Sequence, residues 1–399
     1  MKTRKEKFYG SRLKEAMQLR AMKLTELAEV TDISKQSLSL YVNEINTPPV
    51  ENVFKMAKAL EVPYSFFIHE PLSSIRTGKT YFRSQASATK RARNAASKKM
   101  QYVAAMYEVL LSKIDFPKLN LPPVNSQNFT EFWDCTADEV ADEIERLALE
   151  VRKYWEVGDG PIENLQYLLE SNGIIVTGFK GEDSHIDAYG QQVNVDGKTV
   201  FVVALELGSK PLGRLRFDMA HELGHILMHR WQLEDEAISR DAFNAIEKQA
   251  NMFASAFLLP RKTFTRAVSA YPTSLRYYTE LKKKWKVSIQ AMMYRAWQLN
   301  IISANQFQYM MRQVSKNGWR LKEPGDVLGR LQDNIFQGAI DLLLDGGYMS
   351  KAEIISEFAK AGIIFNHDDL ENLMCLKSGT LAPEAREIKF PVLQVKKGC

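Results

Sequence analysis

A segment of ten residues, AHELGHILMH at 220–229, constrains this chain most, because it holds three of the six histidines. The residues around these histidines are apolar, which predicts a helix buried inside a domain. On such a helix His221 and His225 are four residues apart, so both imidazoles project from one face, one turn apart. Two ring nitrogens at this spacing are able to bind one zinc ion, and the neighbouring Glu222 is placed to act as a general base on water.

A third ligand for the ion is available downstream. Glu247 opens the segment EKQANMFASAFLLP, 22 residues after His225. Asn251 lies one helical turn later, where it is able to support the ligands as a polar neighbour. Two histidines and one glutamate leave the fourth position of Zn2+ to water, which is the catalytic rather than the structural arrangement. An accidental HExxH is expected in roughly one chain in a hundred of this length, but it requires neither a buried helix nor a third ligand.

His229 needs a separate interpretation, because it stands four residues beyond His225 on roughly the same helix face. Three ligands on successive turns of one straight helix span about 12 Å. That distance is too long for three bonds of about 2 Å to one ion. We therefore predict that His229 packs against the ligands or supports them without binding the metal.

The first hundred residues differ from the rest of the chain in charge. They contain 19 Lys and Arg against 9 Asp and Glu, a net charge of +10, so the remaining residues carry −5 of the total of +5. This distribution indicates that the N-terminal part meets a polyanion, and an unevenly charged surface is the alternative. From Ser11 to Ile68 the apolar spacing predicts short helices without strand-like alternation, with Ser34 as the N-cap of one helix that runs to about Val42.

The middle of the chain predicts a small sheet. Residues 71–84 have the composition of a linker, with Pro71 and Gly78 among them. Ile174–Phe179 is apolar and β-branched, as expected of a strand. Two further strands, Gln192–Val195 and Thr199–Val203, flank the dipeptide Asp-Gly at 196–197, which is the strongest short signal for a hairpin. Helical segments before and after this sheet predict an α+β protein.

Other features exclude several classes of protein. The first residues, MKTRKEKFYGSRLKEAM, are too charged for the apolar part of a signal peptide. No run of about 18 apolar residues is present, so a membrane span is not expected. The three cysteines lie far apart, which argues against a disulfide framework and against a cysteine-based zinc site. We therefore expect a cytoplasmic protein without a membrane partner.

The residues of the proposed metal site also carry a family resemblance. HELGHILMH, the segment EKQANMFASAFLLP and the preceding RLRF closely resemble the ImmA/IrrE metallopeptidase family over about residues 160–265. The resemblance implies that His221, His225 and Glu247 bind zinc and that Glu222 is the base. It further implies a zincin-like fold in which a strand near the active-site helix pairs with the substrate, expected here at Thr199–Val203. Known members cleave transcriptional repressors, so the implied substrate is a repressor.

The N-terminal unit resembles the helix-turn-helix of the phage-repressor (Xre) class, with Thr25–Thr31 and Ser34–Val42 as the two helices. Asp32 stands at the turn where a glycine is usual, and Asp tolerates the left-handed conformation better than most residues. A helical protein-interaction module is the alternative, and Glu26 and Glu44 near the expected DNA face count in its favour. The resemblance implies that double-stranded DNA contacts one face of the second helix, through Lys35, Gln36, Ser37 and Ser39.

These features predict four parts of the chain. A helix-turn-helix DNA-binding domain covers 1–70, a linker and helical connector 71–155, a zincin-like metallopeptidase domain 156–300, and a helical regulatory or capping region 301–399. Two segments, YFRS at 81–84 and NGWRLKEP at 317–324, also resemble parts of long regulators with this domain order, and no chemistry is assigned to them.

The expected protein is a transcriptional regulator that binds DNA as a homodimer and carries a zinc-dependent endopeptidase. The expected substrate of the peptidase is a repressor or another regulatory protein. The alternative is a non-proteolytic transcription factor whose zinc-site domain senses a ligand or a partner. Intact ligands and an intact base at Glu222 favour the peptidase, because a degenerate site has no need of them.

Overall fold

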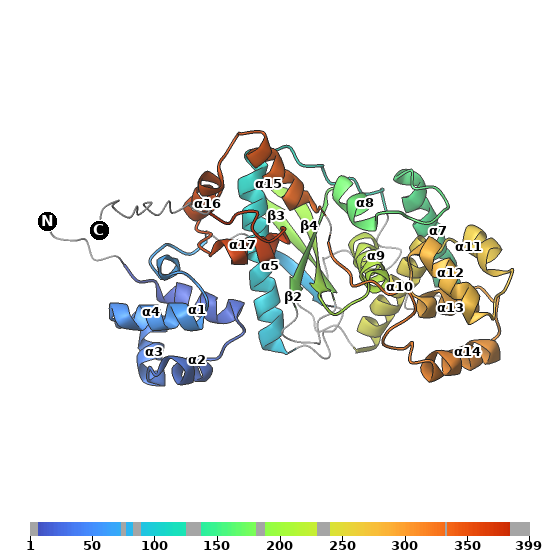
Figure 1. The fold of residues 1–399 in the computed structure, drawn as a ribbon, viewed down its shortest axis with the longest axis horizontal. Coiled ribbons are helices and arrows are strands. Elements are labelled where there is room, and N and C mark those ends of the chain that lie inside the picture. Colours follow the sequence, from blue (N-terminus) through green and yellow to red (C-terminus); the bar gives the residue numbers. More distant parts are fainter. Residues whose placement is uncertain are drawn as a thin grey trace, which may run out of the picture.

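The structure is a computed structural model that describes residues 7–72, 77–82, 89–124, 137–180, 188–229, 240–331 and 333–383. These residues form a helical N-terminal unit, a mixed four-stranded sheet and helices on both sides of the sheet (Figure 1). The predicted α+β class is confirmed. Among the helices described, none is long and apolar enough to cross a membrane.

The N-terminal unit consists of short helices joined by tight turns. The hydroxyl of Ser34 accepts a hydrogen bond from the backbone N–H of Ser37 at 3.1 Å, so the predicted N-cap is confirmed. Asp32 has a φ of 54°, which is the left-handed conformation that its place in the turn requires. The helices of the unit are α1 (Gly10–Leu19), α2 (Leu24–Thr31), α3 (Lys35–Val42), α4 (Val50–Ala59) and the 3-10 helix η1 (Tyr64–Phe67).

The sheet contains the predicted hairpin at its centre. β3 (Ala188–Val195) pairs antiparallel with β4 (Lys198–Leu207), and Asp196 and Gly197 both have positive φ in the turn between them. β2 (Ile174–Lys180) pairs parallel with β4 on its other side. β1 (Thr77–Phe82) pairs antiparallel with β3, which gives the strand order β1-β3-β4-β2.

Two expectations about the sheet are wrong. The linker expected at 71–84 contains β1, because a strand partner more than a hundred residues away outweighs the local turn composition. The strand expected to receive the substrate, Thr199–Val203, belongs to β4, which lies inside the sheet. Its residues from Phe201 onward pair with β2 as well as with β3, so their backbone groups are not available to an added strand.

The described residues form two hydrophobic cores, one on each side of the sheet. Successive residues of a strand point to opposite faces, so Val202 belongs to one core and Val203 to the other. The first core joins the N-terminal unit to α5 (Lys90–Leu111), α15 (Ile335–Asp345), α16 (Lys351–Lys360) and α17 (His367–Met374). The second core contains α7 (Ala137–Tyr154), α8 (Leu165–Ser171), α9 (Leu212–Met228), α10 (Arg240–Leu258), α11 (Arg261–Val268), α12 (Leu275–Trp285), α13 (Ile289–Gln298) and α14 (Ala304–Lys316).

The C-terminal region is divided between these cores. Residues such as Met310 and Val314 pack in the second core, whereas Phe336, Ile340 and Phe358 pack in the first. The chain therefore crosses from one side of the sheet to the other after α14. Its last helices cover α5 and the N-terminal unit rather than the helices that carry the histidines.

A buried arginine fixes the N-terminal unit to this first core. Arg12 is 0% exposed and donates hydrogen bonds to the Tyr102 hydroxyl of α5 at 2.9 Å and to the Gly362 carbonyl beyond α16 at 2.7 Å. Arg20 also forms an ion pair with Asp369 of α17 at 3.1 Å. The N-terminal unit is thus held against both α5 and the C-terminal helices.

Candidate metal centre

α9 carries the two histidines of the HELGH motif and lies between the sheet and α10. Gly224 allows α10 to come close, because a Cβ at this position would lie 3.1 Å from the Phe253 side chain and 3.3 Å from the Ala250 Cα. His221 and His225 are 0% and 1% exposed, so their ring nitrogens cannot rely on water for hydrogen bonds. Their partners must come from the protein or from a bound ion.

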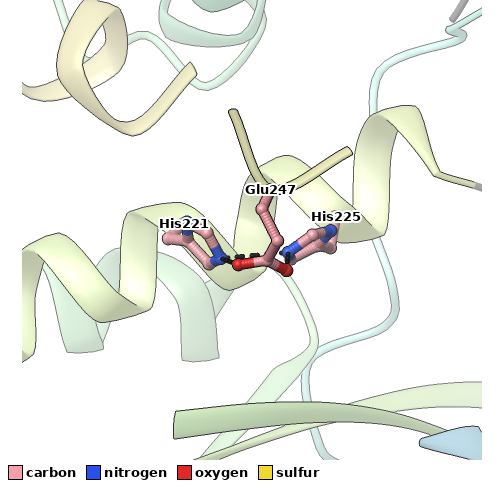
Figure 2. A group of neighbouring side chains, drawn as sticks. All are labelled: His221, His225 and Glu247. Atoms are coloured by element: carbon pink, nitrogen blue, oxygen red, sulfur yellow. Dashed lines mark hydrogen bonds and ion pairs between the residues drawn. The ribbon is translucent and has the colours of Figure 1, made fainter. Parts of the chain in front are cut away.

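Glu247 of α10 reaches the same point as the two histidines, and Figure 2 shows its carboxylate between the two rings. The two Nε2 atoms lie 3.0 Å apart. The Glu247 carboxylate oxygens lie 3.5 Å from His221 Nε2 and 3.3 Å from His225 Nε2. Two ligands at about 2.0–2.1 Å from a tetrahedral zinc ion are about 3.3 Å apart, so the three side chains match the size of that ion.

The proton on His221 is fixed by Asn251 of α10. His221 Nδ1 lies 3.1 Å from Asn251 Oδ1. An amide oxygen only accepts hydrogen bonds, so the ring must carry its proton on Nδ1. In the neutral ring Nε2 then presents a lone pair toward Glu247, which is the form that binds a metal.

The proton on His225 is fixed in the same way through two residues. His229 is buried, and burial lowers its pKa to about 3, so its ring is neutral near pH 7. Its Nε2 donates to Gln249 Oε1 at 2.8 Å, because that oxygen only accepts. His229 Nδ1 therefore accepts the proton of His225 Nδ1 at 2.9 Å. His225 Nε2 is left with a lone pair toward Glu247.

Two lone pairs and a carboxylate thus converge on one point, which favours a bound cation. A neutral ring with its proton on Nδ1 has none on Nε2 to donate, so a proton or a metal cation must bridge these atoms. The donor set of two imidazoles and one carboxylate suits zinc.

Comparison with known proteins agrees with both parts of this architecture. Residues 180–296 match the IrrE N-terminal-like domain, a peptidase family, and residues 13–67 match a helix-turn-helix family. The chain joins a helix-turn-helix domain to an IrrE N-terminal-like domain. The site of His221, His225 and Glu247 lies inside the IrrE-like domain.

Two individual proteins are similar to parts of the chain. The HTH-type transcriptional regulator SutR of Escherichia coli (strain K12) is 37% identical over 68 residues, which are 17% of this chain and 38% of SutR. A Mycobacterium tuberculosis transcriptional regulator of known structure is 20% identical, with a TM-score of 0.26, over 43% of this chain and 51% of that one. The chain therefore covers no more than about half the length of either protein.

A cavity of about 760 Å³ adjoins the candidate metal site in the IrrE-like domain, since Glu247 and Asn251 form part of its wall. Its polar edge carries both signs of charge, since Lys248 and Arg320 line it together with Glu247 and Glu323. Its apolar lining suits a large apolar side chain. The apolar part of the wall consists of Phe217, Met252, Tyr294, Phe307, Met311 and Trp319.

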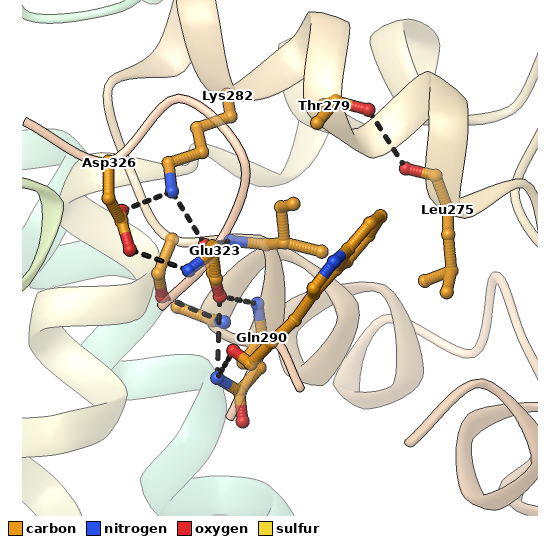
Figure 3. A network of polar contacts seen from close by, with 10 residues as sticks. Leu275, Thr279, Lys282, Gln290, Glu323 and Asp326 are labelled. Carbon is orange, nitrogen blue, oxygen red and sulfur yellow. Dashed lines mark hydrogen bonds and ion pairs between the residues drawn. The ribbon is translucent and has the colours of Figure 1, made fainter. Parts of the chain in front are cut away.

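The NGWRLKEP segment completes this cavity and is held in place by a polar network (Figure 3). Glu323 is 6% exposed and accepts hydrogen bonds from the backbone N–H of Ile289 at 2.7 Å and of Gln290 at 3.1 Å, at the start of α13. Lys282 of α12 donates to Glu323 at 2.8 Å and also to Asp326. The segment, which had no assigned chemistry, thus acts as a brace for one wall of the cavity.

Sequence patterns did not reveal Gln249 or the cavity. Gln249 touches His229 only because α10 packs against α9, and no spacing within one helix reports a contact between two helices. A polar residue two positions after a proposed ligand was the only available signal. The predicted residues His221, His225, Glu247, Asn251 and His229 are all brought together, and Glu222 is buried beside them at 1% exposure.

The four residues expected to face DNA lie in or near the first turns of α3. Lys35 and Gln36 are exposed. Ser37 and Ser39 are partly buried, and the Ser37 hydroxyl lies 2.8 Å from the hydroxyl of Ser34. The structure therefore presents Lys35 and Gln36 more fully to a partner than the two serines.

The two acidic residues near this face have structural partners. Glu44 accepts a hydrogen bond from the backbone N–H of Gly10 at 3.0 Å, at the start of α1. Glu26 accepts one from the backbone N–H of Lys23 at 2.7 Å and forms an ion pair with Arg91 of α5 at 2.9 Å. Both acids therefore have roles in holding the helices, which explains their presence without a protein partner.

Proposed function

We propose that the protein is a transcriptional regulator whose IrrE-like domain is a zinc-dependent endopeptidase. The observation that carries the proposal is the convergence of two Nε2 lone pairs with the Glu247 carboxylate. Asn251 keeps the proton of His221 on Nδ1, and His229 does the same for His225. His221, His225 and Glu247 would hold the ion. When bound, zinc polarises the scissile carbonyl and makes water easier to deprotonate.

Glu222 is the proposed general base. It follows the first ligand on α9 and is 1% exposed, so little water competes for its carboxylate. In this role it takes a proton from the attacking water and passes it to the leaving amine. The apolar wall of the neighbouring cavity holds a side chain of the substrate, and a repressor or another regulatory protein supplies that peptide.

The N-terminal domain is proposed to bind double-stranded DNA. The match to a helix-turn-helix family and the similarity to SutR support this part of the proposal. Lys35 and Gln36, at the exposed start of α3, are the proposed base and phosphate contacts, with Ser37 and Ser39 beside them. We further propose that the protein acts in the cytoplasm as a homodimer. Helix-turn-helix dimers bind palindromic DNA sites whose symmetry matches the two-fold axis of the protein dimer.

Replacement of Glu222 by Gln tests the peptidase, because Gln keeps the shape of the side chain but cannot take a proton. The zinc-loaded wild type and Glu222→Gln are incubated with a candidate repressor, and products are identified by mass spectrometry. Cleavage by the variant should be 10² to 10⁴ times slower while its zinc content stays at wild-type level. His225→Ala is the matched control and should lose both zinc and cleavage. Equal cleavage by wild type and Glu222→Gln would rule out this base.

A regulator that senses a ligand without proteolysis is the second candidate. The docking of the DNA-binding domain through Arg12 favours it, because the two domains share one framework through α5 and the sheet. In that case zinc or a ligand changes DNA affinity in the Glu222→Gln protein as much as in the wild type. A peptidase shows instead a loss of cleavage in Glu222→Gln while its zinc stays bound.

A further inference from the structure

We infer that α14 and the segment NGWRLKEP (317–324) select the substrate of the peptidase, by holding a large apolar side chain of the peptide next to the cleaved bond. This inference rests on the proposed peptidase and names the class of peptide that it accepts. It concerns residues beyond 296, where the match to the IrrE N-terminal-like domain ends. The selectivity wall is defined as the apolar residues that this part of the chain contributes to the cavity of about 760 Å³: Phe307, Met311 and Trp319.

The cavity is continuous with the candidate metal site. Its lining includes Glu247, a proposed ligand, and Asn251, which holds the proton of His221. α10 therefore carries both a proposed ligand and one side of the cavity, and the selectivity wall supplies another side from later in the chain. Consecutive Cα atoms of a peptide are about 3.8 Å apart, so a peptide whose cleaved bond lies at the metal site also brings a neighbouring side chain to the cavity.

The fold leaves the selectivity wall incompletely covered. Phe307, Met311 and Trp319 pack against the second core, yet each is only partly buried. Phe307 stacks on Trp297 with 5.5 Å between the ring centroids and lies edge-on to Tyr294 at 6.1 Å. Concave apolar surface of this kind is typical of ligand pockets, and an aromatic or long aliphatic side chain buries the most apolar area in it. The occupant that fits is therefore a large apolar side chain.

The selectivity wall is held in place by the polar network of Figure 3. Gln290 Nε2 donates to the Trp319 carbonyl and to the Glu323 carboxylate, both at 3.4 Å. Lys282 donates to Glu323 at 2.8 Å, and the Glu323 N–H donates to Asp326 at 2.7 Å. Both carboxylates are thus engaged inside the protein and do not favour a basic side chain. A wall that is already ordered binds its occupant with little loss of conformational freedom.

Two hydroxamates that differ in one side chain test the inference, because a hydroxamate binds zinc through its oxygens and places its side chain nearby. The probes are N-acetylphenylalanine hydroxamate and N-acetylalanine hydroxamate. Their dissociation constants are measured by isothermal titration calorimetry on the zinc-loaded full-length protein and on the metal-free protein. The phenylalanine compound should bind the zinc-loaded protein roughly 10 to 100-fold more tightly than the alanine compound, because it buries an aromatic ring in place of a methyl group.

The role of the wall is tested by Phe307→Ala. This variant should reduce the affinity ratio of the two compounds by about 2 to 10-fold, which is the range for loss of one contact between aromatic rings. Tyr309→Ala is the matched control, since Tyr309 is on the same helix, is 57% exposed and does not line the cavity. Phe307→Leu keeps the apolar packing and should restore most of the ratio. Met311→Ala, one turn further along the wall, gives the same test if Phe307→Ala does not fold.

Failure of the inference and failure of the proposed function give different results. Equal affinity of wild type for the two compounds overturns the inference, as does an unchanged ratio in Phe307→Ala or an equal fall in Phe307→Ala and Tyr309→Ala. Zinc-dependent binding of both compounds then still supports the proposed metal site. If neither compound binds more tightly to the zinc-loaded than to the metal-free protein, the proposed zinc site is refuted and the inference with it.

Discussion

Replacement of His229 by Phe should weaken zinc binding although His229 is not one of the proposed ligands. In the wild type His229 Nδ1 accepts the proton of His225 Nδ1 at 2.9 Å and so keeps the lone pair of His225 on Nε2. Phe removes this acceptor. The proton of His225 is then free to move to Nε2, where Glu247 lies 3.3 Å away and accepts it. Metal binding must afterwards displace that proton, and the buried Nδ1 also lacks a partner in the metal-bound state.

The size of the effect follows from the loss of one neighbour of a ligand, which typically costs 10 to 100-fold in metal affinity. This range corresponds to about 1.4 to 2.7 kcal/mol. The dissociation constant is measured by competition with a chromophoric zinc chelator, on metal-free protein whose fold is checked by thermal unfolding. His69→Phe, at an exposed position after η1, is the matched control and should bind zinc as wild type does. A dissociation constant for His229→Phe within about threefold of wild type would show that His229 does not set the protonation of His225.

Three further predictions concern stability. Arg12→Met should lower the free energy of unfolding by about 3 to 5 kcal/mol, because it leaves several carbonyls without their donor and the buried Glu15 with Lys98 as its remaining ion-pair partner. Lys55→Gln, in an exposed pair with Glu51, should cost less than about 1 kcal/mol in the same urea titration. Burial raises the pKa of Glu170 to about 8, above its ordinary value of 4.5, so stability should fall as pH rises between these values. Glu170→Gln should abolish this fall of stability with pH and raise the free energy of unfolding by up to about 3 kcal/mol at pH 7, as measured by urea titrations across the pH range. An unchanged dependence of stability on pH would contradict the prediction. Truncation before residue 317 should give an insoluble product, because it removes the helices that cover the first core; a soluble remnant would contradict this.

Local patterns predicted the local structure well. The Asp-Gly turn at 196–197, the N-cap Ser34 and the left-handed Asp32 are all confirmed, because each depends on the chemistry of a few adjacent residues. Strand neighbours depend on residues far apart in the chain. For that reason β1 was mistaken for a linker, and the central strand β4 was mistaken for the strand that receives a substrate.

The same distinction applies to the metal centre. The spacing of His221 and His225 on one helix is a local property, so the sequence alone places them on one face. The contact of Gln249 with His229 arises where α9 meets α10, and it depends on how closely Gly224 lets the two helices approach. The residues proposed as ligands could therefore be named from the sequence, whereas the residues that fix their protons required the packing of the helices.

The arrangement of the two cores bears on how metal binding and DNA binding are connected. α9 packs on one face of β3 and β4, and α5 packs on the other face of β3. Val202 and Val203, adjacent in β4, belong to different cores, so a shift of the strand changes the packing of both. Coupling between two sites requires two states that each ligand distinguishes, and a shared sheet supplies only the physical route. Zinc should therefore alter DNA affinity only if it moves α9 against this sheet. Equal DNA affinity in the zinc-free and zinc-loaded Glu222→Gln protein would show that the sheet holds both domains without connecting their functions.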